Sequence, residues 1–241
     1  MALDWQVFCQ DTIDKTVVPG CFGSGGANGT QTYLDWLISA WGQTVLVAAL
    51  SLVVALVVGS LVGTIRTLPD SPRLARTGNV WVEFFRNIPL LTLLVLFVFG
   101  LPDVGVSYSL FTSAGVCLAL SGAAFVCEAM RAGINTVSVG QAEAARAIGL
   151  TFTQTLRDVV LPQALRTMVQ PLVNVFIGTV LGTSLVAAVG VSDLTNRYQF
   201  LTLKYAEGIP LALAAGVLYV VVTLGAGAAG SILERRLAVR R

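Results

Sequence analysis

The stretch WLISAWGQTVLVAALSLVVALVVGSLVGTI, residues 36–65, decides the fold class, because its thirty residues include no Asp, Glu, Lys or Arg. A helix needs about 20 apolar residues to cross a bilayer. Comparable charge-free runs occupy 104–127, 167–192 and 208–233. The window 87–102 is shorter, and it spans only if it takes in residues 81–85 or tilts little. We therefore predict an all-α membrane protein with about five transmembrane helices.

Composition excludes several functions. Of the 241 residues 55% are hydrophobic and 12% are charged, against about 25% charged in an average soluble domain. The chain has no histidine, which excludes His-based triads and His ligation of haem or zinc. Lys15 and Lys204 are the only lysines and neither lies in a GxxxxGK[ST] loop, so the chain carries no phosphate-binding loop of its own. We predict a protein that is not an enzyme and has no cofactor or metal. The scattered basic residues give no support for nucleic-acid binding.

The basic residues predict an orientation. If the segments after the first span, between the third and fourth spans, and after the last span are cytoplasmic, twelve of the fifteen basic residues lie inside. Only Lys15, Arg197 and Lys204 then lie outside. The positive-inside rule places the N-terminus outside and the C-terminus inside, as an odd number of spans requires. We divide the chain into an external segment (1–40), a membrane domain (41–235) and a cytoplasmic tail (236–241).

The four cysteines fall into two pairs. Cys117 and Cys127 lie in a hydrophobic span, where a small apolar packing role is expected. Cys9 and Cys21 enclose eleven residues of the external segment. A disulfide could close this loop if the segment faces an oxidising compartment.

Small and charged residues near the spans mark candidate helix contacts. Glycine spacing that allows close approach of helices in lipid occurs at Gly59 and Gly63, at Gly178 and Gly182, and at Gly225, Gly227 and Gly230. Ionisable groups are costly near a membrane unless they pair or face water, so Glu83, Arg86, Glu128 and Arg131 are candidates for a polar seam or gate. Glu128 and Arg131 are three residues apart, which predicts a pair on one helical face.

The segment 138–162 predicts two short cytoplasmic helices. Ser138 with Gln141 has the pattern of a capping box, and Gly149 is a suitable helix stop. Thr151 with Gln154 has the same capping pattern, and Pro162 is expected to end or kink the second helix. The alanines beside Glu143 make a smooth face suited to a groove on another protein, although an ordinary amphipathic surface helix has the same pattern.

These residues also resemble a known motif. Glu143-Ala144-Ala145, three residues, Gly149, nine residues, Val159, one residue and Leu161-Pro162 resemble the EAA loop of bacterial ATP-binding-cassette (ABC) importer permeases. Phe85-Arg86-Asn87-Ile88-Pro89-Leu90-Leu91 and Leu161-Pro162-Gln163-Ala164 are similar to the polar amino-acid branch of that family. Thr32-Tyr33-Leu34-Asp35-Trp36 and Arg66-Thr67-Leu68-Pro69 resemble permeases of glutamate/aspartate importers.

The resemblance implies a multi-pass permease subunit of the bacterial inner membrane, with the fold of a type I importer transmembrane domain. Its implied partners are a second permease, equal or different, two copies of an ABC ATPase that hydrolyses ATP, and an external solute-binding protein. Its implied cargo is a polar amino acid, with glutamate/aspartate favoured and glutamine or a basic amino acid as alternatives. The resemblance assigns ATPase docking to Glu143, Ala144, Ala145, Gly149, Leu161 and Pro162. A rival of another class is a structural membrane anchor of an enzyme complex.

One run departs from the family pattern. Members commonly have a Lys-Asp-Thr-Ser-Leu-like run where this chain has Leu181-Gly182-Thr183-Ser184-Leu185. Either the partner permease supplies the missing cation or the run is structural. Polar groups in hydrocarbon tend to face a cavity or another helix. The polar candidates for the substrate path in or beside spans two to four are Asn87, Glu128, Asn174, Thr183 and Ser184.

Overall fold

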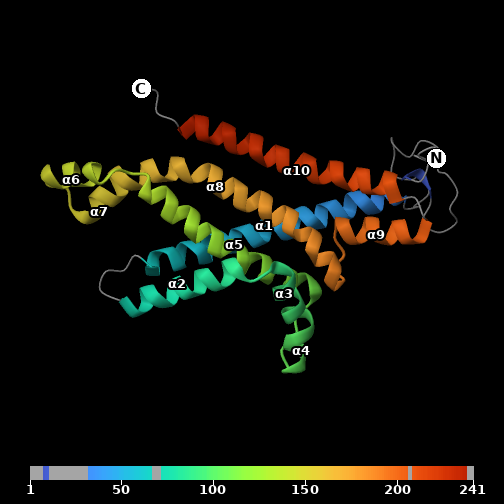
Figure 1. Cartoon of the computed structure of the whole chain (residues 1–241). Coiled ribbons are helices and arrows are strands. Elements are labelled where there is room, and N and C mark those ends of the chain that lie inside the picture. Colours follow the sequence, from blue (N-terminus) through green and yellow to red (C-terminus); the bar gives the residue numbers. More distant parts are fainter. Residues whose placement is uncertain (1–7, 11–31, 67–71, 206–207, 238–241) are drawn as a thin grey trace.

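The computed structural model describes residues 8–10, 32–66, 72–205 and 208–237. Within these ranges the chain forms the following helices, which Figure 1 labels: α1 (Tyr33–Arg66), α2 (Pro72–Asn87), α3 (Leu90–Val95), α4 (Leu101–Asp103), α5 (Leu110–Asn135), α6 (Val139–Ala147), α7 (Phe152–Gln154), α8 (Leu161–Gly182), α9 (Leu194–Tyr205) and α10 (Gly208–Leu237). Two π-helical segments, Leu96–Gly100 and Thr155–Val160, and a 3₁₀ segment, Thr183–Val189, join some of them. The all-α prediction is confirmed.

Four helical stretches among the described residues are long and apolar enough to cross a membrane: Tyr33–Arg66, Leu110–Asn135, Phe152–Val189 and Gly208–Leu237. The predicted second span is broken, because α2 and the stretch Leu90–Asp103 meet at an angle of 99°. Five spans result only if this bent pair counts as one. Pro89 causes the break: it has extended backbone angles (φ −60°, ψ 131°), and a proline also disfavours helical angles at the residue before it.

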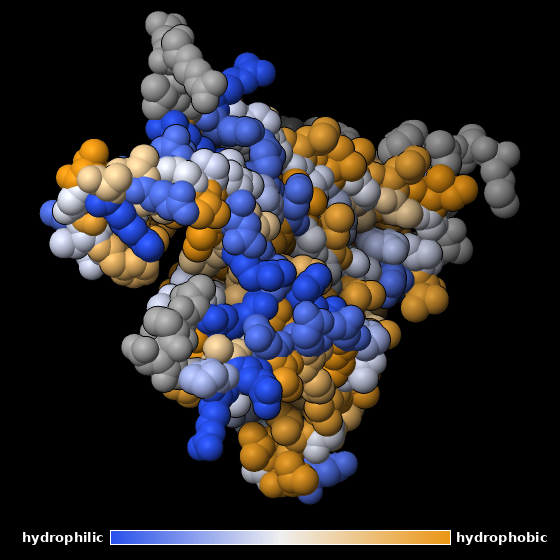
Figure 2. Space-filling model, turned by 60° about the vertical axis from the view of Figure 1, so that its left-hand side comes forward, coloured by the Kyte–Doolittle hydropathy of each residue, from blue (hydrophilic) through white to orange (hydrophobic). Residues whose placement is uncertain are grey.

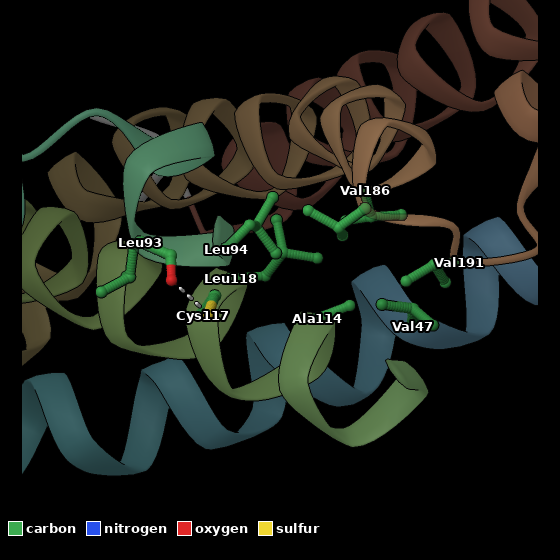
Figure 3. Close-up of a cluster of buried hydrophobic side chains, with 9 residues drawn as sticks. Val47, Leu93, Leu94, Ala114, Cys117, Leu118, Val186 and Val191 are labelled. Atoms are coloured by element: carbon green, nitrogen blue, oxygen red, sulfur yellow. Dashed lines mark hydrogen bonds between the residues drawn. The ribbon is translucent and has the colours of Figure 1, made fainter. Parts of the chain in front are cut away.

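The helices pack around α5, which lies between α1, α2 and α8, while α8 also contacts α10. Figure 3 shows the core where α1, α3 and α5 meet the 3₁₀ segment. Leu94 and Leu118 are buried there, and the Cys117 thiol lies 3.6 Å from the Leu93 carbonyl oxygen. Cys117 and Cys127 are both free and buried in apolar clusters, as predicted, but Cys127 Sγ also accepts a hydrogen bond from Arg66 Nη1 at 3.3 Å. The possible Cys9–Cys21 disulfide involves Cys21, which lies outside the described residues.

Only some of the glycines predicted to allow close helix packing lie against a neighbouring helix. A Cβ on Gly59 would lie 2.6 Å from the Ala123 carbonyl oxygen, and one on Gly230 would lie 2.5 Å from a Val173 methyl carbon. At Gly182 the nearest side-chain atoms would lie 3.1 Å and 3.3 Å away, whereas Gly63 has only an ordinary contact at 3.7 Å. The seam prediction is wrong at three positions where nothing lies within 4 Å of a built Cβ: Gly178, Gly225 and Gly227.

The molecule has two distinct ends along its helices. One end holds residues 8–10, the start of α1, and α9 (Figure 1). The other end holds α6, α7 and the end of α10. Figure 2 turns the α6–α7 end forward and shows hydrophilic residues gathered over it, with hydrophobic surface beyond them. The loop 138–162 is thus separated from α9 by the length of the bundle.

Candidate functional site: a helical elbow and a groove between spans

The elbow, as we call residues 138–162, begins without the capping box predicted at Ser138. Ser138 occupies the N-cap position with extended backbone angles, but its side chain makes no capping hydrogen bond. The Gln141 amide donates instead to the Ser138 carbonyl oxygen at 3.0 Å. That prediction is therefore wrong, because the main chain already satisfies the amide that the hydroxyl would have capped.

Gly149 ends α6 as the sequence predicted. Its φ is +90°, a conformation that glycine adopts at little cost. The Leu150 amide donates to the Ala145 carbonyl oxygen at 3.1 Å, and the Gly149 amide donates to that of Arg146 at 2.9 Å. These two bonds form a Schellman motif, which satisfies the last carbonyls of the helix. The turn therefore fixes the direction in which the chain leaves α6.

The second half of the elbow begins with the predicted capping box. The Gln154 amide donates to Thr151 Oγ1 at 3.3 Å, and the Thr151 amide donates to Gln154 Oε1 at 2.9 Å. Of the two predicted effects of Pro162, ending the helix is wrong, because Pro162 lies in the first turn of α8 directly after the π-helical segment Thr155–Val160. Helical backbone therefore runs through Pro162, where the proline ring leaves no amide to donate to an earlier turn. The elbow is thus continuous with the long helix α8.

The elbow exposes one part of the EAA motif and buries another. Glu143 and Ala144 are exposed, whereas Ala145 is only 4% exposed and faces inward. Leu161 and Pro162 are exposed at the start of α8. Three apolar side chains that belong to no sequence motif are also exposed on the elbow, each about 70% or more: Val139, Ile148 and Phe152. Such exposed apolar groups are typical of a contact surface.

A groove of about 540 Å³ runs between α5 and α8. Its walls are mostly apolar, with side chains such as Leu90, Leu118 and Phe125. Two predicted path residues, Glu128 and Asn174, line it. Ser121 and Thr179 also line it and were missed, because a single hydroxyl in a long apolar run gives no signal in sequence about which way it faces. Gly178 lines the groove as well, which explains the empty space beside it.

Glu128 lies at the centre of a charged cluster. Its Oε1 accepts from Arg66 Nη1 at 2.5 Å and its Oε2 accepts from Arg131 Nε at 3.2 Å, so the predicted pair with Arg131 is confirmed. Arg86 Nη1 lies 3.8 Å from Glu128 Oε2 and from Glu83 Oε1. Arg66 also donates to Asn79 Oδ1 at 2.6 Å. The cluster therefore joins α1, α2 and α5, as the predicted polar seam requires.

The other three predicted path residues lie outside the groove lining. Asn87 is exposed and donates to the Glu83 carbonyl oxygen at 2.7 Å. Ser184 donates to the Leu181 carbonyl oxygen at 2.7 Å. Thr183 is buried and donates to the Val180 carbonyl oxygen at 2.7 Å. Each of these hydrogen bonds goes to a main-chain carbonyl of the previous turn, and Thr183 Oγ1 also lies 3.4 Å from the Tyr219 hydroxyl.

A second polar cluster, missed in sequence, lies near the end of the molecule opposite the elbow. Asp193 is 3% exposed, and its Oδ1 accepts from the Asn196 amide at 2.8 Å. The Tyr219 hydroxyl donates to Asp193 Oδ2 at 3.3 Å and lies 2.9 Å from Thr195 Oγ1. Burial raises the pKa of the Asp193 carboxyl above its ordinary value, and the hydrogen bonds it accepts oppose that rise in pKa. The cluster ties the start of α9 to α10.

These features define a helical membrane protein with a groove between its spans and, at one end, a helical elbow shaped by the turn at Gly149 and the Thr151–Gln154 capping box. The chain belongs to the family described as the binding-protein-dependent transport system inner membrane component, whose model matches residues 55–239. It is therefore a transport permease of the membrane, as the resemblance of its EAA loop implied.

Relatives in this family are permeases of amino-acid transporters. The chain is 34% identical over 215 residues to the "Probable glutamine ABC transporter permease protein GlnP" of Bacillus subtilis (strain 168), covering 88% of this chain and 96% of that one. It is 32% identical over 191 residues to the glutamate/aspartate import permease protein GltJ of Escherichia coli (strain K12), covering 74% and 77%.

Solved structures of ABC transporters have the same fold as this chain. One described as an amino acid ABC transporter with histidines superposes with a TM-score of 0.80 at 29% identity, covering 85% of this chain and 95% of that chain. An inward-facing MetNI methionine ABC transporter superposes with a TM-score of 0.72 at 26% identity, covering 86% and 98%. The fold is that of an ABC type I importer transmembrane domain.

Proposed function

We propose that this permease imports a polar amino acid into the cytoplasm by alternating access. It pairs with a second permease, receives its cargo from an external solute-binding protein, and couples to two copies of a separate ATPase that hydrolyses ATP. The observation that carries this proposal is the elbow, which projects beyond the spans and leads directly into α8, a wall of the groove. A displacement of the elbow is thereby transmitted to the groove.

ATPase docking is assigned to the exposed part of the elbow. Glu143 offers a charge to a basic or hydrogen-bonding partner, and Ala144 permits close approach beside it. Ala145, Gly149, Leu161 and Pro162 complete the assignment: Ala145 and Gly149 hold the shape of the elbow, and the other two connect it to α8. Glu143→Lys should leave membrane insertion unchanged while reducing ATPase association and binding-protein-stimulated hydrolysis together. Normal assembly and transport by this variant would remove the docking role.

The orientation follows the basic residues and the two ends of the molecule. The N-terminus is proposed to face outside and the tail after Arg235 to face the cytoplasm, which places the elbow inside. An impermeant thiol reagent should then reach Cys9 or Cys21 in intact cells after reduction. Labelling of these thiols only after lysis would reverse the assignment. Mass spectrometry of unreduced peptides tests the proposed Cys9–Cys21 disulfide, and free thiols at both positions would remove it.

The cargo is proposed to be glutamate or aspartate. The start of α1, with Thr32-Tyr33-Leu34-Asp35-Trp36, and the glutamate/aspartate relative support this assignment. A second candidate is glutamine, because the groove lining holds Asn174, Ser121 and Thr179 but no basic side chain among its described residues. An acidic cargo would then need a cation from the second permease.

Uptake of labelled amino acids by the reconstituted transporter separates the two candidates. Unlabelled glutamate and aspartate should compete with labelled glutamate, and glutamine should compete weakly. The reverse order of competition would select glutamine. Within the groove, Asn174→Ala and Glu128→Ala should change uptake or substrate preference. Asn87→Ala, Thr183→Ala and Ser184→Ala test the remaining predicted path residues, and unchanged uptake in all five variants would place the path elsewhere.

A further inference from the structure

The helix α2 has an outward face that no described element of this chain covers. A groove of about 600 Å³ runs along it, lined by Arg73, Arg76, Thr77, Val80, Trp81 and Phe84. Val80 is 64% exposed and Phe84 is 55% exposed. The opposite face is fully packed: Val82 is 0% exposed against Ala124 and Cys127. The groove therefore looks away from the core of the bundle.

The two arginines at one end of this groove have no anionic partner among the described residues. Arg66, Arg86 and Arg131 all lie within 4 Å of Glu128, but the ion pairs of the described residues include neither Arg73 nor Arg76. Two neighbouring cations at the end of an apolar groove attract a ligand with an anionic head and an apolar tail. In a membrane this description fits an anionic phospholipid.

The dimensions of the groove also fit a lipid. A helix rises about 1.5 Å per residue, so the twelve residues from Arg73 to Phe84, with eleven rises between them, span about 16 Å. That length is about half of the roughly 30 Å hydrocarbon core, which is one leaflet. The arginines lie at the start of α2, at the same end of the bundle as the elbow (Figure 1). With the orientation proposed above, they lie at the cytoplasmic surface.

We propose that this face of α2 binds one anionic phospholipid of the cytoplasmic leaflet. Its phosphate lies between the guanidinium groups of Arg73 and Arg76, and an acyl chain lies along Val80, Trp81 and Phe84. This inference rests on the membrane location and the orientation, not on the identity of the transported amino acid.

Trp81 provides a probe within the groove. The assembled transporter is placed in nanodiscs of phosphatidylcholine, to which either phosphatidylglycerol or phosphatidylcholine with brominated acyl chains is added. The Trp81 signal is the fluorescence that Trp81→Phe removes. We expect brominated phosphatidylglycerol to quench this signal at an at least about fivefold lower mole fraction than brominated phosphatidylcholine, given the known attraction of each arginine to an anionic surface.

Three variants locate the effect. Arg73→Gln with Arg76→Gln should abolish the preference for phosphatidylglycerol while quenching by brominated phosphatidylcholine remains, which shows that the groove is intact. Arg73→Lys with Arg76→Lys should keep most of the preference. Arg235→Gln with Arg236→Gln is the matched control, because it removes two exposed charges from the end of α10. This control should leave the preference unchanged.

The proposal is overturned by any of four results. The first is equal quenching of Trp81 by the two lipids in the parent protein, and the second is survival of the preference in the double glutamine variant of α2. An equal loss in the α10 control would indicate bulk attraction to the membrane surface. Absence of quenching by both lipids would mean that another protein subunit covers this face. None of these readouts depends on uptake, so they are independent of the proposed cargo.

Discussion

Substitution of Gly149 tests whether the rigid shape of the elbow matters for coupling. A Cβ at this position would meet nothing within 4 Å, so a steric clash contributes nothing. The whole cost comes from the backbone, because φ is +90° and an L-residue pays about 1–2 kcal/mol for a left-handed conformation. That energy corresponds to a factor of about 5–30 in an equilibrium constant.

We therefore expect Gly149→Ala to weaken ATPase binding to the permease by about 5–30-fold. Asn visits the left-handed region more readily than Ala, so Gly149→Asn should have a smaller effect. Asp tolerates the left-handed conformation as Asn does but adds a negative charge to the elbow, so any loss in Gly149→Asp beyond that of Gly149→Asn reports the effect of the charge. The measurement is titration of the purified ATPase onto the detergent-solubilised permease, together with uptake in reconstituted vesicles.

Gly140→Ala is the matched control for Gly149→Ala. Gly140 also has nothing within 4 Å of a built Cβ, but it lies inside α6 and does not have a positive φ. Alanine there should be neutral or stabilise the helix by about 0.5–1 kcal/mol. If both alanine variants bind the ATPase like the parent, the reasoning is refuted, because strain in the turn would then not reach the docking surface. Equal loss in both would indicate that any change in the loop disrupts binding.

Two further predictions concern the polar clusters. Glu128→Gln leaves Arg66 without its carboxylate partner, in a pair whose side chains are 12% and 18% exposed. The lost charged hydrogen bond should lower the free energy of unfolding by about 1.5–3 kcal/mol. An unchanged thermal midpoint in detergent would contradict this expectation. The pKa of the Asp193 carboxyl is raised, so the folded state holds the Asp193 proton more tightly than the unfolded state does. This group therefore favours folding most below the ordinary Asp pKa. It loses that contribution as the pH rises through its pKa in the folded state. Asp193→Asn keeps a helix-capping side chain and should flatten the pH dependence of the thermal midpoint just above the ordinary Asp pKa; a slope equal to that of the parent would count against it.

The spans were predictable because the physics that selects them is local. A backbone in hydrocarbon must satisfy its hydrogen bonds within the segment, so a long charge-free run is enough to predict a helix, as residues 36–65 show. The break at Pro89 is also a local signal. The 99° angle between α2 and the stretch Leu90–Asp103 has no local signal in the sequence. It depends on the direction of α3, which is set by packing of Leu94 against Leu118 and Val186, two residues distant in sequence.

Two ion pairs of Glu128 likewise differ in whether local sequence spacing could predict them. Glu128 and Arg131 are one helical turn apart, and their pairing followed from spacing alone. Arg66 lies 62 positions from Glu128 in sequence, and no pattern in the chain gives the register between α1 and α5. The sequence therefore predicted that Glu128 needs a charged partner, but it did not predict that Arg66 lies nearest to its carboxylate.

Glycine spacing illustrates what a motif leaves open. A small side chain allows close approach, but a neighbouring helix must be present to make use of it. Gly182 meets Leu90 and Leu118, whereas Gly178, one turn earlier on α8, faces the groove beside Asn174. The same GxxxG pair therefore acts as a packing contact at one glycine and leaves free volume at the other. Because a larger side chain at Gly178 would project into that free volume, this glycine keeps the groove open while Gly182 holds α8 against α3 and α5.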